Sequence, residues 1–350
     1  MSLGPRKVVA RSTVNIIARD NGAGLSRDID LLYALFRTRG WRVLVNGRRS
    51  RHPGEMPKRI ALRAMRELSS LGIASRVMSP RWALNLHLED IAPPYIPLAR
   101  RNVLIPNQEY FREFSRPHLS KMDVVLTKSR HAEQVFTHHG CDARFVGWRS
   151  MDRRTSRTLH SDATALHVAG RSQLKGTDAV LDAWVRHPEW PTIVVVRQRL
   201  GYDDLPLPWT PRAFPTNVRL IDERVSNERL KELQNSIPIH IAPSEAEGFG
   251  HVLVESMSVG AVIITTDAAP MNELITGARG ILVDVAQSEP MNFGHLARVS
   301  VDDLERKIQA AFNMPLNERD ALGRSARAWF EDNDHAFEPR FWTAIESICR

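Results

Sequence analysis

Two glutamates and two glycines lie close together in a segment whose residue types suit a ligand rich in hydroxyl groups. Glu247 follows the short apolar run 237–241, and Glu255 comes eight residues later, inside a stretch predicted to be helical. Carboxylates accept hydrogen bonds, so the pair suits groups such as a sugar and a ribose. Gly248 and Gly250 let a ligand approach the backbone closely. The start of the helix beyond them offers free N–H groups that suit a phosphate.

The surrounding elements alternate between short β-branched runs and amphipathic helices, which is typical of parallel α/β units. In the first half, the pattern predicts strands at 8–17, 41–45, 102–105 and 124–127, and a helix at 28–39. In the second half, it predicts strands at 165–169, 192–196, 218–221, 237–241, 261–265 and 280–283, and helices at 302–312 and 318–330. Apolar periodicity is lost at 150–163, where we expect a linker between two domains. Ligands of such sheets bind at the carboxyl ends of the strands.

The segment 243–275 resembles the Glu-x7-Glu signature of the retaining glycosyltransferases of family four. The matching positions are Pro243, Ser244, Glu247, Gly248, Phe249, Gly250, Glu255, Ser256, Met257, Gly260, Val262, Ile263 and Glu273. The stretch 167–176 resembles the VGR…KG element of the family, and 21–24 resembles the glycine-rich loop after its first strand. Residues 123–129 resemble its last strand of the first domain. The resemblance implies an α/β chain with the GT-B fold, in which two Rossmann-like domains face each other across a cleft.

The same resemblance implies a domain division and a function. It places an acceptor-binding domain at 1–158 and a nucleotide-sugar-binding domain at 159–335, followed by a helix at 336–350 that returns to the first domain. The expected enzyme is a retaining hexosyl- or pentosyltransferase that uses a nucleotide-sugar donor as a substrate. The family needs no catalytic metal, so we expect neither a metal nor another cofactor.

Roles are implied residue by residue. Glu247, Arg171 and Lys175 are the expected catalytic residues: Glu247 would bind sugar hydroxyls, while the two cations would neutralise the donor diphosphate. Glu255 would hold the ribose. The remaining donor-binding candidates are Gly248, Phe249, Gly250, His251, Gly22, Ala23 and Gly24.

The sequence departs from the family pattern at three places. The strand at 102–105 is followed by Asn107 and Glu109 and lacks the histidine that often lines the sugar cleft, so these two residues are candidates for the acceptor side. His251 stands where the family usually has an apolar or small residue. Gly260 is followed by Ala261 and Val262 and not by the usual x-Pro.

Charge is divided unevenly along the chain. The formal net charge is +8, but residues 1–160 hold 29 Lys or Arg against 13 Asp or Glu, whereas residues 161–350 hold 19 against 27. The first half should therefore attract an anion. Its most basic stretch is 48–66, where Arg59, Arg63 and Arg66 are acceptor-side candidates on a predicted helix. Anionic lipid and nucleic acid both fit this charge, and the lack of a nucleic-acid-binding motif favours lipid.

The expected acceptor is therefore an anionic glycolipid or an envelope polysaccharide precursor. Two alternatives stay open: transfer of a sugar to hydroxylated bases of DNA, and a non-catalytic protein that binds nucleotide sugars or polyanions. No stretch approaches the roughly 20 apolar residues of a membrane-spanning helix, and the N-terminus lacks the features of a secretory signal. We expect a cytoplasmic protein that rests peripherally on the inner face of the membrane.

Overall fold

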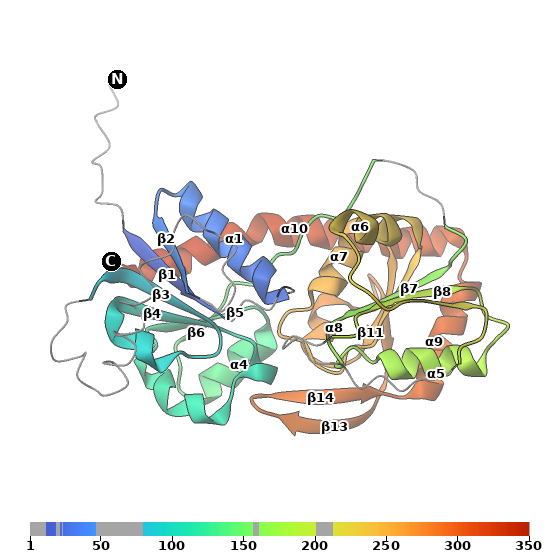
Figure 1. Ribbon diagram of the computed structural model, residues 1–350, viewed down its shortest axis with the longest axis horizontal. Coiled ribbons are helices and arrows are strands. Elements are labelled where there is room, and N and C mark those ends of the chain that lie inside the picture. Colours follow the sequence, from blue (N-terminus) through green and yellow to red (C-terminus); the bar gives the residue numbers. More distant parts are fainter. Residues whose placement is uncertain are drawn as a thin grey trace, which may run out of the picture. The chain divides into compact units, whose positions relative to one another are not determined.

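The computed structural model describes residues 12–18, 22, 24–46, 80–156, 161–200 and 213–349. The chain divides into two compact units, each containing a six-stranded sheet (Figure 1). The first unit comprises residues 1–127, 133–144 and 342–350, and the second comprises 128–132 and 145–341. The assignment of acceptor binding to one half and donor binding to the other stays a prediction.

The sheet of the first unit has the strand order β2-β1-β3-β4-β5-β6. Its strands are β1 (Thr13–Ile17), β2 (Arg42–Asn46), β3 (Trp82–Glu89), β4 (Ala99–Pro106), β5 (Val124–Thr127) and β6 (Ala143–Phe145). The pairings of β1 with β2 and β3, of β3 with β4, and of β4 with β5 are all parallel. The sequence did not predict β3, although it is a central strand.

Polar side chains inside β3 explain why its pattern was missed. Asn85 is buried, accepts a hydrogen bond from Asn15 of β1 at 2.9 Å, and donates to Asn102 of β4 at 2.9 Å. Asn46 of β2 donates to Asn15 in turn, so an asparagine ladder crosses four neighbouring strands. Buried amides that satisfy one another fix the register of the strands.

The helices of the first unit cover and connect these strands. They are α1 (Gly24–Thr38), the 3-10 helices η2 (Pro93–Leu98), η3 (Gln108–Tyr110) and η4 (Glu113–Lys121), and α4 (Arg130–His138), whose first three residues belong to the second unit. Helix α1 begins four residues before the predicted start and buries Ile29, Leu32 and Phe36 at helical spacing. Ser129 caps α4, because its Oγ accepts a hydrogen bond from the Ala132 backbone N–H at 3.1 Å.

The sheet of the second unit has the order β12-β11-β10-β7-β8-β9, and all five pairings are parallel. Its strands are β7 (Ala165–Gly170), β8 (Ile193–Arg197), β9 (Val218–Ile221), β10 (Ile239–Ala242), β11 (Val262–Thr266) and β12 (Ile281–Val283). The helices of this unit are α5 (Thr177–Arg186), α6 (Asn227–Ser236), α7 (His251–Val259), α8 (Met271–Leu274) and α9 (Val301–Asn313). Each predicted strand of this half is present within two residues of its expected bounds.

Two elements of the second half differ from the prediction. An antiparallel hairpin of β13 (Val285–Met291) and β14 (Gly294–Val299) follows β12, where no strand was predicted. The last helix, α10 (Leu316–Cys349), is one continuous element, whereas the sequence predicted a helix ending at Phe330 and a separate one later. Pro339 lies inside α10 and did not end it. Within the described ranges, no helix has the length and hydropathy needed to cross a membrane.

Candidate functional site

The second unit brings Lys175 and Glu247 into direct contact at the carboxyl ends of β7 and β10. Lys175 Nζ donates to Glu247 Oε1, and Ser244 Oγ donates to the same oxygen at 2.8 Å. The Glu245 backbone N–H also donates to the carbonyl of Leu174 at 3.0 Å, which joins the two loops that carry these side chains. Neighbouring parallel strands thus place a cation and a carboxylate together where ligands of such sheets bind.

Gly176 allows the two loops to meet. Its φ is +64°, a conformation that side-chain-bearing residues rarely adopt, and a Cβ on it would lie 2.2 Å from the carbonyl oxygen of Pro243. Gly176 is also the N-cap of α5. The glycine after Lys175 is therefore required by the close approach of the neighbouring loop.

His167 connects the elements that carry Lys175 and Glu247. It is fully buried, with Nδ1 2.7 Å from the carbonyl oxygen of Ile241 and Nε2 2.9 Å from Thr177 Oγ1. Burial lowers the pKa of His167 to about 4, and the charge of Lys175 acts in the same direction. The imidazole is therefore neutral at physiological pH and connects β7, β10 and α5.

Glu255 lies on α7 and is 2% exposed. Its Oε2 is 3.4 Å from Nε of Arg153, a residue that is itself 2% exposed, and it accepts a hydrogen bond from Gln234 Nε2 at 3.2 Å. Ser150 Oγ is 3.4 Å from Oε1 and 3.0 Å from His251 Nδ1. The carboxylate is thus held by neighbouring side chains, and its predicted contact with a ribose stays a prediction.

The start of α7 provides the features of an anion site. Gly250, with φ of +100°, is its N-cap, and the nine-residue helix has no acidic residue in its first turn. Phe249, just before it, is 4% exposed. The first N–H groups of the helix and the positive end of its dipole therefore suit a phosphate.

The other predicted site residues lie in several places. Arg171 follows β7, and its Nε donates to the carbonyl of Leu200 at 3.1 Å. Gly22 (φ +73°) and Gly24, the first residue of α1, belong to the first unit. Ala23, Arg59, Arg63 and Arg66 lie outside the described residues.

The acceptor-side candidates Asn107 and Glu109 also belong to the first unit. Asn107 Nδ2 is 3.4 Å from Glu89 Oε2, and Asn107 is the N-cap of η3. Glu109 is 3% exposed within that short helix. Their predicted role toward an acceptor remains a prediction.

The sequence did not indicate the partners of Glu255 or the support that the hairpin gives to the Glu247 loop. Arg153 lay in the stretch interpreted as a linker, and nothing in its context indicated burial. Likewise, the Ala297 backbone N–H of β14 donates to the Glu245 carbonyl at 2.7 Å, so the hairpin is attached to the loop that carries Glu247. Both are long-range contacts that no local pattern encodes.

Comparison with known proteins agrees with this geometry. Residues 214–329 match the family model of the glycosyl transferases group 1, a range that includes β10, the Glu247 loop and α7. No curated protein matches the chain in sequence. Among solved structures, sucrose-phosphate synthase from Thermosynechococcus elongatus has a TM-score of 0.68 at 15% identity, covering 97% of this chain and 99% of that one. The fold is that of the GT-B glycosyltransferases.

Two further structures have the same fold. A glycosyltransferase from Rickettsia africae has a TM-score of 0.68 at 12% identity, with 98% of this chain and 100% of that one covered. The HepE protein of Anabaena, in complex with UDP and glucose, has a TM-score of 0.62 at 12% identity, with coverages of 96% and 100%. These likenesses show the fold, and the group 1 match supports a glycosyltransferase.

Proposed function

We propose that the chain transfers a hexosyl or pentosyl group from a nucleotide sugar to an anionic acceptor, with retention at the anomeric carbon. The contact between Lys175 and Glu247 carries this proposal. The ammonium provides a positive charge for the donor phosphates, and the carboxylate provides an acceptor for sugar hydroxyls. Arg171, which follows the same strand, would add a second cation as charge develops on the leaving diphosphate.

Binding of a donor would rearrange the Lys175–Glu247 contact. The first oxygen of Glu247 already accepts hydrogen bonds from both Lys175 and Ser244. A phosphate that takes over the ammonium would free this oxygen for a sugar hydroxyl. The ion pair would thus keep the two side chains close before a donor binds. Glu247 lies within the range matched by the group 1 family model.

The acceptor that we favour is an anionic glycolipid or an envelope polysaccharide precursor at the inner face of the membrane. Its basis is the excess of basic residues in the first 160 residues. The same charge would attract DNA, and transfer to hydroxylated bases is the second candidate. Salt-sensitive binding to duplex DNA, without binding to anionic vesicles, would favour DNA.

Release of nucleoside diphosphate tests the proposal. UDP-, GDP-, ADP- and CDP-sugars are incubated with the protein without an acceptor, starting with UDP-glucose, because the Anabaena neighbour holds UDP and glucose. We expect slow hydrolysis of one donor, reduced at least about 100-fold in Glu247→Gln and Lys175→Ala, as for loss of a preorganised charge contact. Glu232→Gln and Lys307→Ala, at positions outside the site, are the matched controls.

The outcome separates the candidates. Hydrolysis that persists in both site variants would contradict the role of the pair. Donor binding in a thermal-shift assay without turnover of any acceptor would favour the non-catalytic nucleotide-sugar-binding protein. If none of the donors binds, the proposal of a donor site is refuted.

A further inference from the structure

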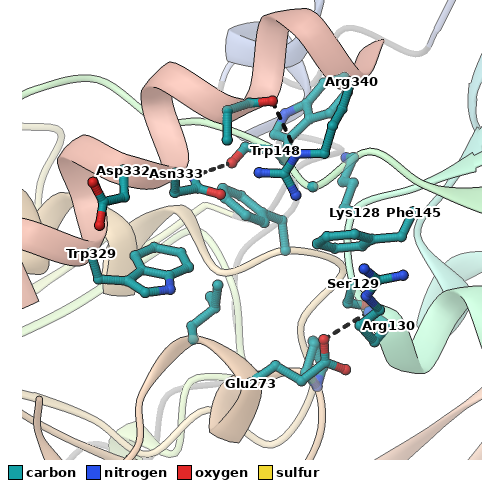
Figure 2. Close-up of a pocket in the computed structure, with 15 residues that line it drawn as sticks. Lys128, Ser129, Arg130, Phe145, Trp148, Glu273, Trp329, Asp332, Asn333 and Arg340 are labelled. Carbon is teal, nitrogen blue, oxygen red and sulfur yellow. Dashed lines mark hydrogen bonds between the residues drawn. The ribbon is translucent and has the colours of Figure 1, made fainter. Parts of the chain in front are cut away.

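A pocket of about 510 Å³ opens in the second unit, and all its lining residues belong to that unit. Figure 2 shows Trp329 and Asp332 of α10 on one side, and Phe145 and Arg130 on the other. Phe249 is the one residue that it shares with the predicted donor set. Its lining residues do not include Glu247, Glu255, Arg171 or Lys175. We call it the Trp329 pocket.

Three cationic side chains converge on the wall of the Trp329 pocket. Lys128 is only 4% exposed, and its Nζ lies 5.0 Å from the centroid of the Trp148 ring. The guanidinium carbons of Arg130 and Arg340 lie 4.1 and 5.3 Å from the ring of Phe145. Lys128 is buried, Arg340 is half-buried and Arg130 is exposed, and three cations on one pocket wall favour a ligand that carries negative charge.

Arg340 gives the clearest sign of an anion site. Its Nε donates to the carbonyl of Ala336 at 3.0 Å, and its guanidinium forms no ion pair with a carboxylate in the part of the chain that the structure describes. Burial and the charge of Arg130 both lower the pKa of Arg340. A phosphate beside both guanidiniums would replace this repulsion with attraction, since it can accept from each planar fork.

The rest of the wall suits a sugar ring. Trp329 presents an aromatic surface that is held in place by Arg279, whose guanidinium carbon lies 5.4 Å from the ring. Phe145 and Phe249 add further apolar surface, and Asp332 adds a hydrogen-bond acceptor for hydroxyl groups. Aromatic platforms with a few convergent polar groups are typical of small-molecule sites.

The geometry of α8 keeps the pocket in shape. Both oxygens of Glu273 accept backbone N–H groups at the start of α4, from Arg130 at 2.7 Å and from His131 at 2.7 Å. Arg279 in turn donates to the carbonyl of Glu273 at 3.0 Å. The carboxylate of Glu273 is thus engaged in holding the wall of the pocket.

We propose that the Trp329 pocket binds a phosphorylated monosaccharide. The phosphate is held by Lys128, Arg130 and Arg340, and the sugar ring packs against Trp329 and Phe145. This inference is independent of the proposed transfer reaction, because the pocket lacks the residues that would bind the donor phosphates and the ribose.

Calorimetric titration of the full chain, without a nucleotide sugar, tests the proposal. The probes are glucose 1-phosphate, glucose 6-phosphate and mannose 6-phosphate, compared with glucose, mannose and inorganic phosphate. We expect at least one sugar phosphate to bind tenfold or more tightly than both its parent sugar and phosphate. Arg340→Gln should weaken it at least tenfold, and Trp329→Leu should weaken the sugar phosphate but not inorganic phosphate.

Controls make the outcomes decisive. Arg324→Gln removes an exposed arginine of the same helix and should leave the affinity unchanged. No binding by any sugar phosphate, or equal binding of phosphate alone, would overturn the proposal. Binding that is lost in Lys175→Ala but kept in Arg340→Gln would place the ligand in the donor site and would also overturn it. UDP-glucose titrated in parallel reports separately on the proposed function.

Discussion

A Cβ atom on Gly176 would lie 2.2 Å from the carbonyl oxygen of Pro243, so the loops after β7 and β10 touch through their backbones. Gly176→Ala should therefore lower the free energy of unfolding by more than about 3 kcal/mol, because the left-handed conformation alone costs about 1–2 kcal/mol and the clash adds to it. The displaced loop should also weaken donor binding.

Gly170→Ala is the matched control for Gly176→Ala. Gly170 has a φ of +59°, but a Cβ there would meet nothing within 4 Å, so only the conformational cost of about 1–2 kcal/mol applies. Urea unfolding of both variants gives the comparison. Equal losses would show that the contact with Pro243 does not constrain the site.

The buried pair of Arg153 and Glu255 predicts that a single variant is much less stable than the double variant. Arg153→Met leaves a carboxylate that is 2% exposed without its cation, which should cost about 3–5 kcal/mol. Arg153→Met combined with Glu255→Gln should recover most of that loss, since the neutral amide can still bond with Gln234 and Ser150.

Denaturant unfolding of the two single variants and the double variant measures this coupling. Arg229→Gln, at the exposed pair with Glu232, is the control and should cost less than about 1 kcal/mol. Additive effects of the two substitutions would mean that Arg153 stabilises the chain without acting on Glu255.

The sequence predicted the second unit well, because its strands are apolar runs and the Glu247 loop carries a dense motif. It failed where the physical signal is not local. Asn85 and His87 interrupt the apolar pattern of β3, although both are buried. A proline inside a helical pattern normally ends the helix, but α10 continues through Pro339. Arg153 resembled a linker residue because its partner is more than 100 positions away.

The asparagine ladder predicts a strong effect of Asn85→Leu in the first unit. The substitution removes the partner of Asn15 and of Asn102, and also the donor to the Tyr95 carbonyl at 2.7 Å. Since each buried polar group left unsatisfied costs about 1–3 kcal/mol, we expect a loss of roughly 3 kcal/mol or more. Asn107→Ala, which removes a long contact of 3.4 Å with Glu89, should cost less than about 1 kcal/mol.

Circular dichroism during thermal unfolding measures the effect of Asn85→Leu. An Asn85→Leu protein as stable as the wild type would mean that strand register in this sheet does not depend on the ladder. A loss confined to Asn85→Leu, with Asn107→Ala unaffected, would show that the buried amides stabilise the sheet.

Two buried histidines predict how the second unit responds to acid. Burial lowers the pKa of both His167 and His240 from 6.5 to about 4. Between these values the unfolded chain binds a proton that the folded chain does not, so stability is complete above pH 6.5 and falls as the pH decreases toward 4. At pH 5.5, each histidine should lower the free energy of unfolding by about 1 kcal/mol relative to neutral pH.

Urea unfolding of the second unit at pH 7.5, 6.5 and 5.5 measures this dependence. His240→Gln keeps a side chain that can bond with Ser256 and the Ile237 carbonyl, the two partners of the ring at 2.7 and 3.1 Å, but it cannot titrate. Between pH 7.5 and 5.5, the free energy of unfolding of the variant should therefore fall by about 1 kcal/mol less than that of the wild type. His335→Gln, at an exposed position of α10, is the matched control. An unchanged pH slope in His240→Gln would mean that this imidazole is protonated in the folded protein as readily as in the unfolded chain.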